Sequence, residues 1–524
     1  MMAFVVASLV LVLGLAVYAL SYLLFPLRHV RGIPTIPFWV ALLPLFKDVD
    51  QQDIFQRYID GPLRKHGAVK LFFASQWNVL VHRPTYMAEV FKHENVYRKS
   101  GNHEKIPHSV LAGFLGDNII SSHGETWKRY QQIIKPGVQA APDLGVLLVN
   151  ARKLCNILRK SQSDIPNGGI GIQASLQRYT IANFSETMFR VNFQVSPSSP
   201  SSCLSGKVFF LVPKLMIRGR QRRTQTLDTS DAYLHQIQYR IKGEIFRPTF
   251  MNFPFLDSLG FPSRKRARQL ASHFTDQLIS ALQSATPPGK LANGLGSHDL
   301  PKSLLDARQS GYLTEKQFRD NVTILFVAGQ ENPQLAMISM LYLLAKHPTF
   351  QDDLLEESDS YSVDGLSQEA LQSMPLLSAV IYESLRLFPP IGQLINRRVT
   401  QHVRLGGDIL IPEGTYVGYN CYSTNRDPET WGPDADSFRP TRWGVTCQEI
   451  QKKYRRRRAR AEFISFHGGQ RACIGERFAV LQLKVTLLVL VRELKWKLDP
   501  SWPDRMTPSG RKESDSAYVI SLSF

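Results

Sequence analysis

Apolar residues fall along the chain in runs and stripes that predict helices more often than strands. The first run, Ala3 to Phe25, is long and carries no charged side chain. Helical patterns of apolar positions recur further on, at 263–284, 318–347 and 476–494. Strand-like alternation is short and late, at 403–411, 415–419 and 517–523. This distribution predicts a mainly α protein with a small β portion, in which helices and strands share one domain.

The first apolar run predicts a membrane anchor. A helix from Ala3 to Phe25 would be about 35 Å long, which exceeds the roughly 30 Å core of a bilayer. The alternative, a cleaved signal peptide, would have a shorter apolar region of about 7–15 residues behind a basic start. Arg28, His29 and Arg31 follow the run, and the positive-inside rule places such residues in the cytosol. We therefore expect a single-pass anchor at residues 1–27.

Prolines mark the exit from this anchor. Pro26, Pro34, Pro37 and Pro44 predict a stiff, non-helical connection. We expect the anchor at 1–27, a proline-rich hinge and membrane-proximal segment at 28–60, and one large domain at 61–524. Repeats of a fixed period are not visible, which argues against solenoids and propellers.

Charge and cysteine usage narrow the list of partners. The 524 residues include 63 Lys and Arg against 44 Asp and Glu, a formal net charge of +19. Such an excess implies an acidic partner, either nucleic acid, an anionic membrane surface or an acidic protein face. The anchor argues against nucleic acid, and we expect no nucleic-acid partner. Five cysteines without a C-x-x-C pair argue against a disulfide scaffold or a zinc ribbon.

The segment 466–475, F-H-G-G-Q-R-A-C-I-G, is the strongest candidate for chemistry. Gly469 and Gly475 allow the backbone to approach a bulky flat ligand. Amides at the start of the helical pattern that follows can stabilise a thiolate at Cys473. Arg471 can pair with a carboxylate on the same ligand, and Phe466 offers an apolar wall. The alternative is a buried structural cysteine in a glycine-rich loop.

The complete pattern F-x-x-G-x-R-x-C-x-G resembles the haem-binding loop of the cytochrome P-450 superfamily. The resemblance implies that the chain binds haem b (iron protoporphyrin IX), with Cys473 as the thiolate ligand of the iron. It implies that Phe466, Gly469, Arg471 and Gly475 contribute to binding the cofactor. It also implies the cytochrome P-450 fold for residues 61–524, which then form the haem-thiolate catalytic domain.

A second motif of the family is present at Glu383-Ser384-Leu385-Arg386. Residues three apart on a helix share a face, so Glu383 and Arg386 can form an ion pair. The resemblance implies that Arg442, in the segment 438–443, joins them. We expect these three residues to form a structural charge network behind the haem, without a role in catalysis.

The long apolar helix predicted at 318–347 carries the sequence A-G-Q-E-N-P at 328–333, which resembles the family's A-G-x-(D/E)-T-T. Pro333 has no amide, so the helix should kink and free the carbonyl of Gly329. The resemblance implies that Ala328 and Gly329 border the cofactor and that Glu331 and Asn332 are catalytic. Asn332 replaces the usual Thr, but its amide can still form hydrogen bonds. A solvent-facing Glu331 is the alternative.

Trp127 lies in G-E-T-W-K-R-Y-Q, which resembles the family's W-x-x-x-R helix beside a haem propionate. The usual Arg is Gln131 here. The resemblance implies a cofactor-binding indole N–H at Trp127, and a simple core tryptophan is the alternative.

The resemblance implies a membrane-anchored haem-thiolate monooxygenase that oxidises a lipophilic small molecule with O2, with electrons from NADPH through a flavoprotein reductase. The expected location is the endoplasmic reticulum membrane, with the catalytic domain in the cytosol. The A-G-x-E-N signature looks closest to the microsomal fungal branch that includes dityrosine-forming and secondary-metabolite oxidases. The replacements at Asn332 and Gln131 leave two alternatives open: oxidative coupling or desaturation on the same fold, and a non-catalytic haem or lipophile carrier.

A basic run, Lys452 to Arg460, precedes the cysteine loop and contains seven cationic residues among nine. We expect this run to form part of the docking surface for the reductase, because it should emerge on the thiolate side of the haem. A solvated insertion is the alternative.

Overall fold

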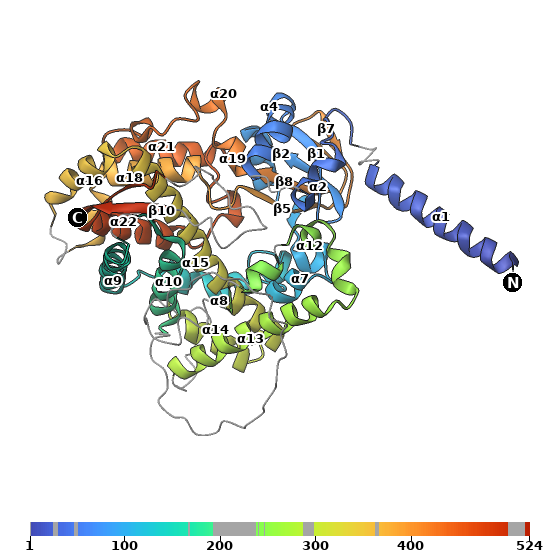
Figure 1. Cartoon of the computed structure of the whole chain (residues 1–524), viewed down its shortest axis with the longest axis horizontal. Helices are drawn as coiled ribbons and strands as arrows, with labels where there is room; N and C mark the ends of the chain where they lie inside the picture. Colours follow the sequence, from blue (N-terminus) through green and yellow to red (C-terminus); the bar gives the residue numbers. More distant parts are fainter. Residues whose placement is uncertain are drawn as a thin grey trace.

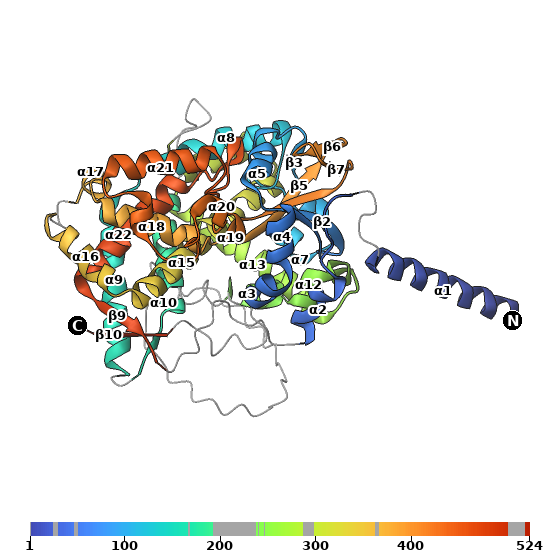
Figure 2. The same ribbon diagram turned by 90° about the horizontal axis from the view of Figure 1, so that it is seen from above.

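The computed structural model describes residues 2–24, 30–46, 51–165, 168–191, 237–238, 240–245, 247–286, 298–361, 366–500 and 519–523. Helices make up most of these residues, and the strands form one larger and two smaller sheets. Figures 1 and 2 show the helices gathered around the long helix α15 (Glu315–Lys346), with the larger sheet to one side. The prediction of a mainly α fold with a small β portion is confirmed.

The helices that precede α15 are α1 (Met2–Leu24), α2 (Phe38–Phe46), α3 (Gln51–Ile54), α4 (Gly61–His66), α5 (Pro84–Lys92), α6 (Asn102–Lys105), α7 (Val110–Leu115), α8 (Gly124–Gln139), α9 (Leu144–Ser163), α10 (Gln173–Phe184), α12 (Pro248–Asn252), α13 (Pro262–Ala285) and α14 (Leu300–Gln309). Those that follow it are α16 (Thr349–Asp359), α17 (Gln368–Gln372), α18 (Pro375–Leu387), α19 (Cys421–Thr424), α20 (Pro428–Trp431), α21 (Cys447–Ala459) and α22 (Glu476–Glu493). The three predicted helices thus correspond to α13, α15 and α22.

Helix α15 begins where its own sequence supplies a cap. The Thr314 hydroxyl accepts a hydrogen bond from the Gln317 amide at 3.2 Å, and the Gln317 side chain accepts one from the Thr314 amide at 3.1 Å. These reciprocal bonds form a capping box, which satisfies two backbone donors that the first turn leaves free. Pro333 lies inside the helix, which continues as one element to Lys346.

The larger sheet has the strand order β1-β2-β8-β5-β3. Its strands are β1 (Ala68–Phe73), β2 (Gln76–Val81), β3 (Tyr97–Lys99), β5 (Gln393–Val399) and β8 (Tyr416–Asn420). Neighbours pair antiparallel except β2 and β8, which are parallel. The smaller sheets comprise β4 (Ile170–Gly171), β10 (Val519–Ser523) and β9 (Lys495–Leu498), and the hairpin of β6 (Val403–Leu405) and β7 (Ile409–Ile411).

Two expectations about the strands were wrong. Half of the described strands precede residue 400, although the alternating pattern predicted strands only after it. Strands β1 and β2 are buried at almost every position, so their sequences lack the in–out alternation of a half-exposed strand. The predicted strand 403–411 is a hairpin, because Gly406 and Gly407 adopt φ values of +62° and +87° that turn the chain between β6 and β7.

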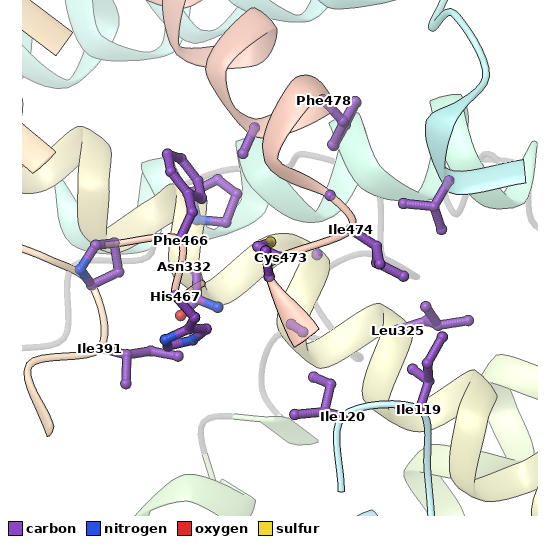
Figure 3. Close-up of a pocket in the computed structure, with 18 of the residues that line it drawn as sticks. Ile119, Ile120, Leu325, Asn332, Ile391, Phe466, His467, Cys473, Ile474 and Phe478 are labelled. Atoms are coloured by element: carbon purple, nitrogen blue, oxygen red, sulfur yellow. The ribbon is translucent and has the colours of Figure 1, made fainter. Parts of the chain in front are cut away.

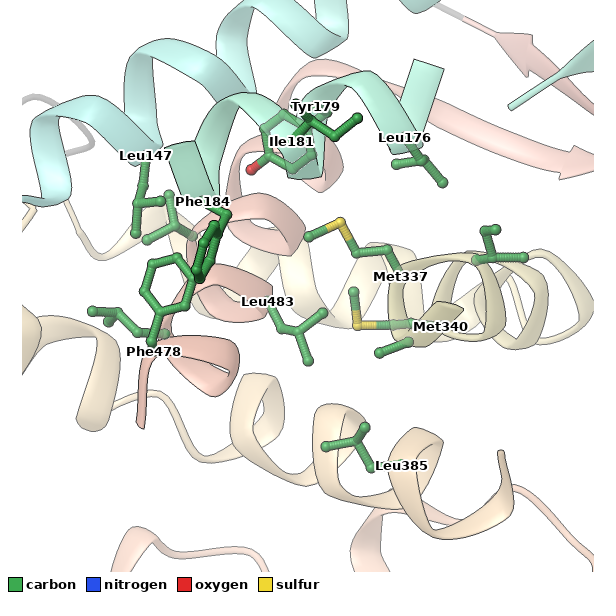
Figure 4. Packing of buried hydrophobic residues seen from close by; sticks show 14 of the residues in the cluster. Leu147, Leu176, Tyr179, Ile181, Phe184, Met337, Met340, Leu385, Phe478 and Leu483 are labelled. Carbon is green, nitrogen blue, oxygen red and sulfur yellow. The ribbon is translucent and has the colours of Figure 1, made fainter. Parts of the chain in front are cut away.

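The main hydrophobic core lies where α10, α15, α18 and α22 meet. Figure 4 shows Phe184 of α10, Met337 and Met340 of α15, Leu385 of α18 and Leu483 of α22 converging there. All five side chains are buried, and burial of such side chains stabilises the fold by roughly 1.5–3 kcal/mol each. This junction fixes the helices that surround the cavity described below.

The N-terminal segment was predicted to be an anchor followed by a stiff connection. Helix α1 corresponds to the predicted anchor and lies apart from the body in both views (Figures 1 and 2). Part of α1 is outside the residues whose side chains the structure describes; among the described ones, no helix is long and apolar enough to cross a membrane. The connection is helical in part, since Pro44 lies inside α2.

The hinge segment also packs against the body. Lys70 of β1 donates its amide to the Pro34 carbonyl at 2.8 Å and accepts a bond from the Ile36 amide at 2.9 Å. Ile36 and Val40 join a small core with Leu63 of α4. Residues 30–46 are therefore held against the larger sheet.

Candidate active site

A cavity lies between α15 and the loop that leads into α22. Figure 3 shows Cys473 at its centre, with Asn332 of α15 nearby and with Ile119, Ile120 and Leu325 around one side. The sequence-predicted residues that line the cavity are Trp127, Ala328, Gly329, Asn332, Phe466, Arg471, Cys473 and Gly475. Residues from three separate stretches of sequence are thus brought to one space.

The loop that carries Cys473 is shaped by its own backbone bonds. The Cys473 amide donates to the Phe466 carbonyl at 2.9 Å, which closes the loop across residues 466–473. Gly469 has φ +64°, and a Cβ atom there would approach the Phe91 carbonyl oxygen to 2.3 Å, so only glycine fits against α5. Gly469 therefore shapes the loop from outside the cavity, and it is not among the residues that line it.

The sulfur of Cys473 faces the cavity at the start of α22. Burial raises the pKa of this thiol to about 11, while the amides of Gly475 and Glu476 point at the sulfur and act in the opposite direction. Amide donors at a helix start stabilise a thiolate, which is the form that binds a metal. The predicted amide environment of Cys473 is present.

Arg471 is buried and holds the neighbouring loop in place. Its guanidinium donates to the carbonyls of Ile119 and Ser122 at 3.1 and 2.9 Å, and pairs with Glu94 at 3.0 Å. It also lies over the Trp127 ring, 4.5 Å from the ring centroid. Arg471 and Trp127, two of the residues expected to bind the cofactor, are thus in direct contact with each other.

On one side of the cavity, the lining residues Lys99 and Arg471 lie beside Arg397 and Glu94. Lys99 lines the cavity, and burial together with Arg397 and Arg471 moves the pKa of its ammonium well below the usual range. Glu94 is the carboxylate that pairs with both arginines. The Nε atom of Arg397 is buried and has no hydrogen-bond partner among the described residues. Arg397 and Arg471 share one carboxylate, and an anionic ligand beside Lys99 would favour its charged form, so this region suits a ligand that carries carboxylates.

These observations test whether the residues fit haem b. A propionate pair would neutralise the excess cations, and the sulfur of Cys473 would face the iron from the adjacent loop. Gly475 and Ala328 offer no bulky side chain against a flat ring. The donor set and the charge of the wall therefore fit the cofactor.

Gly329 of α15 lies against Phe184 of α10. A Cβ atom at this position would lie 2.0 Å from the Phe184 ring of α10. Gly329 is therefore required for helix packing at the edge of the cavity, in addition to any role of its carbonyl.

Glu331 does not line the cavity, although the sequence motif suggested a catalytic role. Its carboxylate accepts a hydrogen bond from Gln238 at 2.8 Å and pairs with Lys242 at 3.0 Å. Successive residues on a helix differ in direction by about 100°, so Asn332 faces the cavity while Glu331 points to another element. The structure thus separates the two residues that the motif places side by side.

The charge network behind the cavity has the predicted members. Glu383 accepts bonds from both Arg386 nitrogens at 2.8 Å and from Arg442 at 3.3 Å. The Trp443 indole adds a bond at 3.0 Å, which the sequence analysis did not anticipate. The side chains of Glu383 and Arg386 are fully buried. This network joins α18 to the segment that leads to the cysteine loop.

Sequence reasoning missed Glu94, Lys99, Arg397 and His467. They come from α5's end, β3, β5 and the cysteine loop, and no local pattern links them. His467 lines the cavity and is bonded to the Tyr419 hydroxyl at 3.1 Å. Burial and the nearby Lys99 and Arg397 lower the pKa of this imidazole to about 3, so it is neutral.

The fold is mainly helical, and Cys473 faces the cavity from the start of a helix, beside a wall suited to propionates. These features together define the haem-thiolate class of proteins. The chain belongs to the cytochrome P-450 family, whose sequence model matches residues 32–514. This family consists of haem b monooxygenases that hold the iron through a cysteine thiolate. The chain is therefore a cytochrome P-450 enzyme.

Two fungal relatives are similar over nearly their whole lengths. Cytochrome P-450 DIT2 of Saccharomyces cerevisiae is 36% identical over 511 residues, covering 96% of this chain and 95% of the relative. Cytochrome P-450 monooxygenase xanG of Aspergillus fumigatus is 35% identical over 515 residues, covering 96% and 90%. A more distant relative, 11-oxo-beta-amyrin 30-oxidase of Medicago truncatula, is 24% identical and covers 78% of this chain and 72% of its own.

Proposed function

We propose that this protein is a membrane-tethered monooxygenase that oxidises a lipophilic small molecule, with electrons delivered from NADPH by a flavoprotein reductase. The observation that carries the proposal is the Cys473 thiol, which faces an apolar cavity from the amide-rich start of α22. The similarity to fungal relatives supports a role in secondary-metabolite biosynthesis.

The residues of this chain take the following roles. Cys473 supplies the thiolate ligand, and the amides of Gly475 and Glu476 limit the basicity of the sulfur. Arg471 and Lys99 line the cavity and would neutralise the propionates, with Arg397 next to them, while Trp127 packs against the Arg471 guanidinium. When bound, haem supplies the iron that activates dioxygen, and its thiolate ligand donates electron density that favours O–O cleavage.

The composition of the cavity wall supports a lipophilic substrate. Away from the cysteine loop, the lining side chains are aliphatic or aromatic, among them Ile120, Leu325, Ile391 and Leu394. Apart from Lys99, Asn332 is the polar side chain on this part of the wall. We infer that the substrate is mostly apolar and that Asn332 hydrogen-bonds either to the substrate or to water beside the reacting centre.

The thiolate assignment is tested by Cys473→Ser. We expect the variant to lose activity and the long-wavelength absorption band of the reduced, CO-bound protein, because a serine oxygen is a much poorer electron donor to iron. A matched control is Cys421→Ser, since Cys421 is buried but lies outside the cavity. A normal band in Cys473→Ser would refute the assignment.

Oxidative coupling or desaturation is the second candidate, and the observation that favours it is Asn332. This residue replaces the Thr that the family motif supplies, and it lines the cavity. Turnover under labelled dioxygen separates the two reactions. Label in the product shows oxygen insertion, whereas label in water alone shows coupling or desaturation. The absence of O2 consumption with every ligand tried would favour a haem or lipophile carrier.

The membrane association rests on the sequence of α1 and on an apolar surface. Trp39 and Phe46 of α2 and Phe255, Leu259 and Phe261 after α12 are all exposed large apolar side chains. Helices α2 and α12 are joined by a hydrogen bond from Asn252 to the Ala41 carbonyl at 2.7 Å. We propose that this surface faces the endoplasmic reticulum membrane from the cytosol, next to a single-pass anchor at 1–27.

Membrane association is tested by deleting residues 1–27 and separately replacing Phe46 and Phe255 with Ser. We expect the deletion to release the protein from the membrane fraction in part, and the combination to release it fully. Full retention of the combined variant would contradict the proposal.

A further inference from the structure

A continuous row of aromatic rings runs beneath helix α21 on the thiolate side of the cavity. The rings of Tyr454 and Tyr382 stack with centroids 4.3 Å apart. Tyr382 lies 5.6 Å from Trp443, and Trp443 lies 5.5 Å from Trp431. All four side chains are buried. The row therefore joins tyrosine and tryptophan, the two side chains that are oxidised most easily by one electron after cysteine, through rings in mutual contact.

One end of the row is close to Cys473. The Tyr454 hydroxyl donates to the Glu476 carboxylate at 2.5 Å. Glu476 is the first residue of α22, and its backbone amide points at the Cys473 sulfur. Tyr454 is therefore connected to the Cys473 sulfur through its hydrogen bond to Glu476 and through the backbone amide of that same residue.

The other end of the row lies beneath the exposed face of α21. The Arg457 guanidinium stacks 4.5 Å from the Trp431 ring centroid, and its side chain is partly exposed. The indole N–H of Trp431 is buried and has no hydrogen-bond partner among the described residues. The row thus leads from the neighbourhood of the thiolate to the protein surface.

Packing alone does not account for the Tyr454 hydroxyl. A phenylalanine would fill the same space between Tyr382 and Phe463, whereas the hydroxyl adds a bond to the Glu476 carboxylate. Arg458 also donates to this carboxylate, at 2.8 Å. Burial and Glu476 raise the pKa of the Tyr454 phenol far above its usual range, so the resting residue keeps its proton.

We propose that Tyr454, Tyr382, Trp443 and Trp431 form a relay that carries oxidising equivalents away from the haem site when no substrate consumes them. In the first step Tyr454 gives up one electron toward the cavity and passes its phenolic proton to Glu476. Tyr382, Trp443 and Trp431 then restore Tyr454 by successive one-electron transfers. Electron tunnelling weakens steeply with distance, so short steps between touching rings are faster than one long step.

The electrons that pass along the relay are taken up by an oxidant and replaced by a reductant. The oxidant is a peroxide, which takes two electrons and two protons for each O–O bond that is broken. The reductant is a one-electron donor in solution of the ascorbate class. Two of its molecules return the two electrons at the Trp431 end and release two protons to the solvent, and these replace the two protons that the peroxide takes from it. The proton on Glu476 returns to Tyr454 when the phenol is reduced. The inference depends on haem at Cys473 and not on the identity of the substrate.

The experiment treats the haem-loaded enzyme with peroxide in the absence of substrate. Tyrosyl and tryptophanyl radicals are recorded by electron paramagnetic resonance after rapid freezing, and haem bleaching is followed by absorbance. We expect Tyr454→Phe to reduce the radical signal several-fold. The haem of this variant should bleach several-fold faster than that of the wild type. Ascorbate should protect the haem of the wild type more than that of the variant. Haem content and melting temperature should be unchanged, since the ring is retained.

The matched control is Tyr179→Phe. Tyr179 of α10 is buried, and its hydroxyl contacts Thr486 of α22 at 2.6 Å, but it belongs to no such row among the residues that the structure describes. This variant should behave as the wild type does. If Tyr454→Phe folds poorly, Glu476→Gln keeps the ring and removes the proton acceptor, and it should show the same two effects. Radical yield and bleaching equal to those of the wild type in both variants would show that the aromatic row serves packing only.

Discussion

At the scale of single residues, adjacent positions on α15 have unrelated surroundings. Asn332 lines the cavity, whereas Glu331 pairs with Lys242 and accepts a bond from Gln238. The ion pair is partly exposed, and such pairs contribute about 0–1 kcal/mol to stability. We therefore expect the polar chemistry of the cavity at Asn332 and not at Glu331.

We predict that Asn332→Ala lowers the rate of product formation by about 10²-fold, the lower range for losing a group that handles protons. Reducing equivalents should instead appear as peroxide. Glu331→Gln is the matched control and should leave the ratio of product to peroxide nearly unchanged. The measurement is NADPH consumption, peroxide and product in one assay. Uncoupling by Glu331→Gln alone would return the catalytic role to that carboxylate.

Lys105 gives a pH dependence that can be measured. Its ammonium lies 4.8 Å from the Tyr416 ring centroid and donates to Asn78 at 2.8 Å, and burial lowers its pKa to about 7. The unfolded chain holds this proton up to a pH of about 10.4. Between these two values the unfolded state binds more protons, so the contribution of Lys105 to stability rises with pH. Below pH 7 Lys105 is charged in both the folded and the unfolded state, so the full cost of burying its charge lowers the free energy of unfolding.

We therefore predict that Lys105→Met raises the melting temperature most below pH 7, and that the gain shrinks toward pH 10. Melting curves of both proteins across this range test the prediction. Lys128→Met is the control, because Lys128 is well exposed on α8. A gain that does not vary with pH would show that packing, and not the charge, causes the effect.

At the scale of elements, the Glu383 network joins α18 to the chain that precedes the cysteine loop. Arg386 donates to the carbonyls of Asn425 and Ala435 at 2.9 and 2.6 Å, in addition to Glu383. Removal of one partner of a buried ion pair costs about 3–5 kcal/mol, because the other charge stays buried without compensation. The network therefore holds the cysteine loop against the helical core.

We predict that Arg386→Ala lowers the free energy of unfolding by about 3–5 kcal/mol and prevents stable haem incorporation. Denaturant unfolding and haem content measure these effects. Glu125→Gln is the comparison, since it breaks the exposed pair with Lys128 and should cost no more than about 1 kcal/mol. Haem incorporation at wild-type levels in Arg386→Ala would contradict a structural role.

Helix α21 shows how one basic run is divided by its helical structure. Tyr454 is buried, Arg457 pairs with Glu462 at 2.7 Å, and Arg458 pairs with Glu476. Lys452, Arg455 and Arg456 are exposed. The run is thus a helix and not a solvated loop, and part of its charge is used to attach it to the body.

At the scale of the whole molecule, the net charge of +19 favours association with acidic surfaces. We predict that changing Lys452, Arg455 and Arg456 to Gln raises the apparent Michaelis constant for the reductase by about 10-fold at low salt. The difference should fade near 0.15 M salt, where the screening length is about 8 Å. Turnover driven by peroxide should be unaffected, because it needs no reductase. An unchanged titration at low salt would exclude docking at these residues.

The sequence alone determined the class of the protein. The pattern around Cys473 is contiguous, because a loop that wraps a cofactor must place glycine, arginine and cysteine at fixed backbone offsets. The pairing of Glu383 with Arg386 was predictable for the same reason, since spacing on a helix sets their shared face. The long helices were also predictable, because their apolar positions persist over many turns.

Tertiary structure decided what depends on distant segments. The cationic wall joins Lys99 of β3 to Arg397 of β5 and to Arg471, and sheet pairing brings Lys99 opposite Arg397. The direction of Glu331 depends on which helix packs beside α15, and the row from Tyr454 to Trp431 depends on how α21 lies on α18. No local pattern encodes these contacts, because each arises from packing between elements that the sequence separates by tens to hundreds of residues.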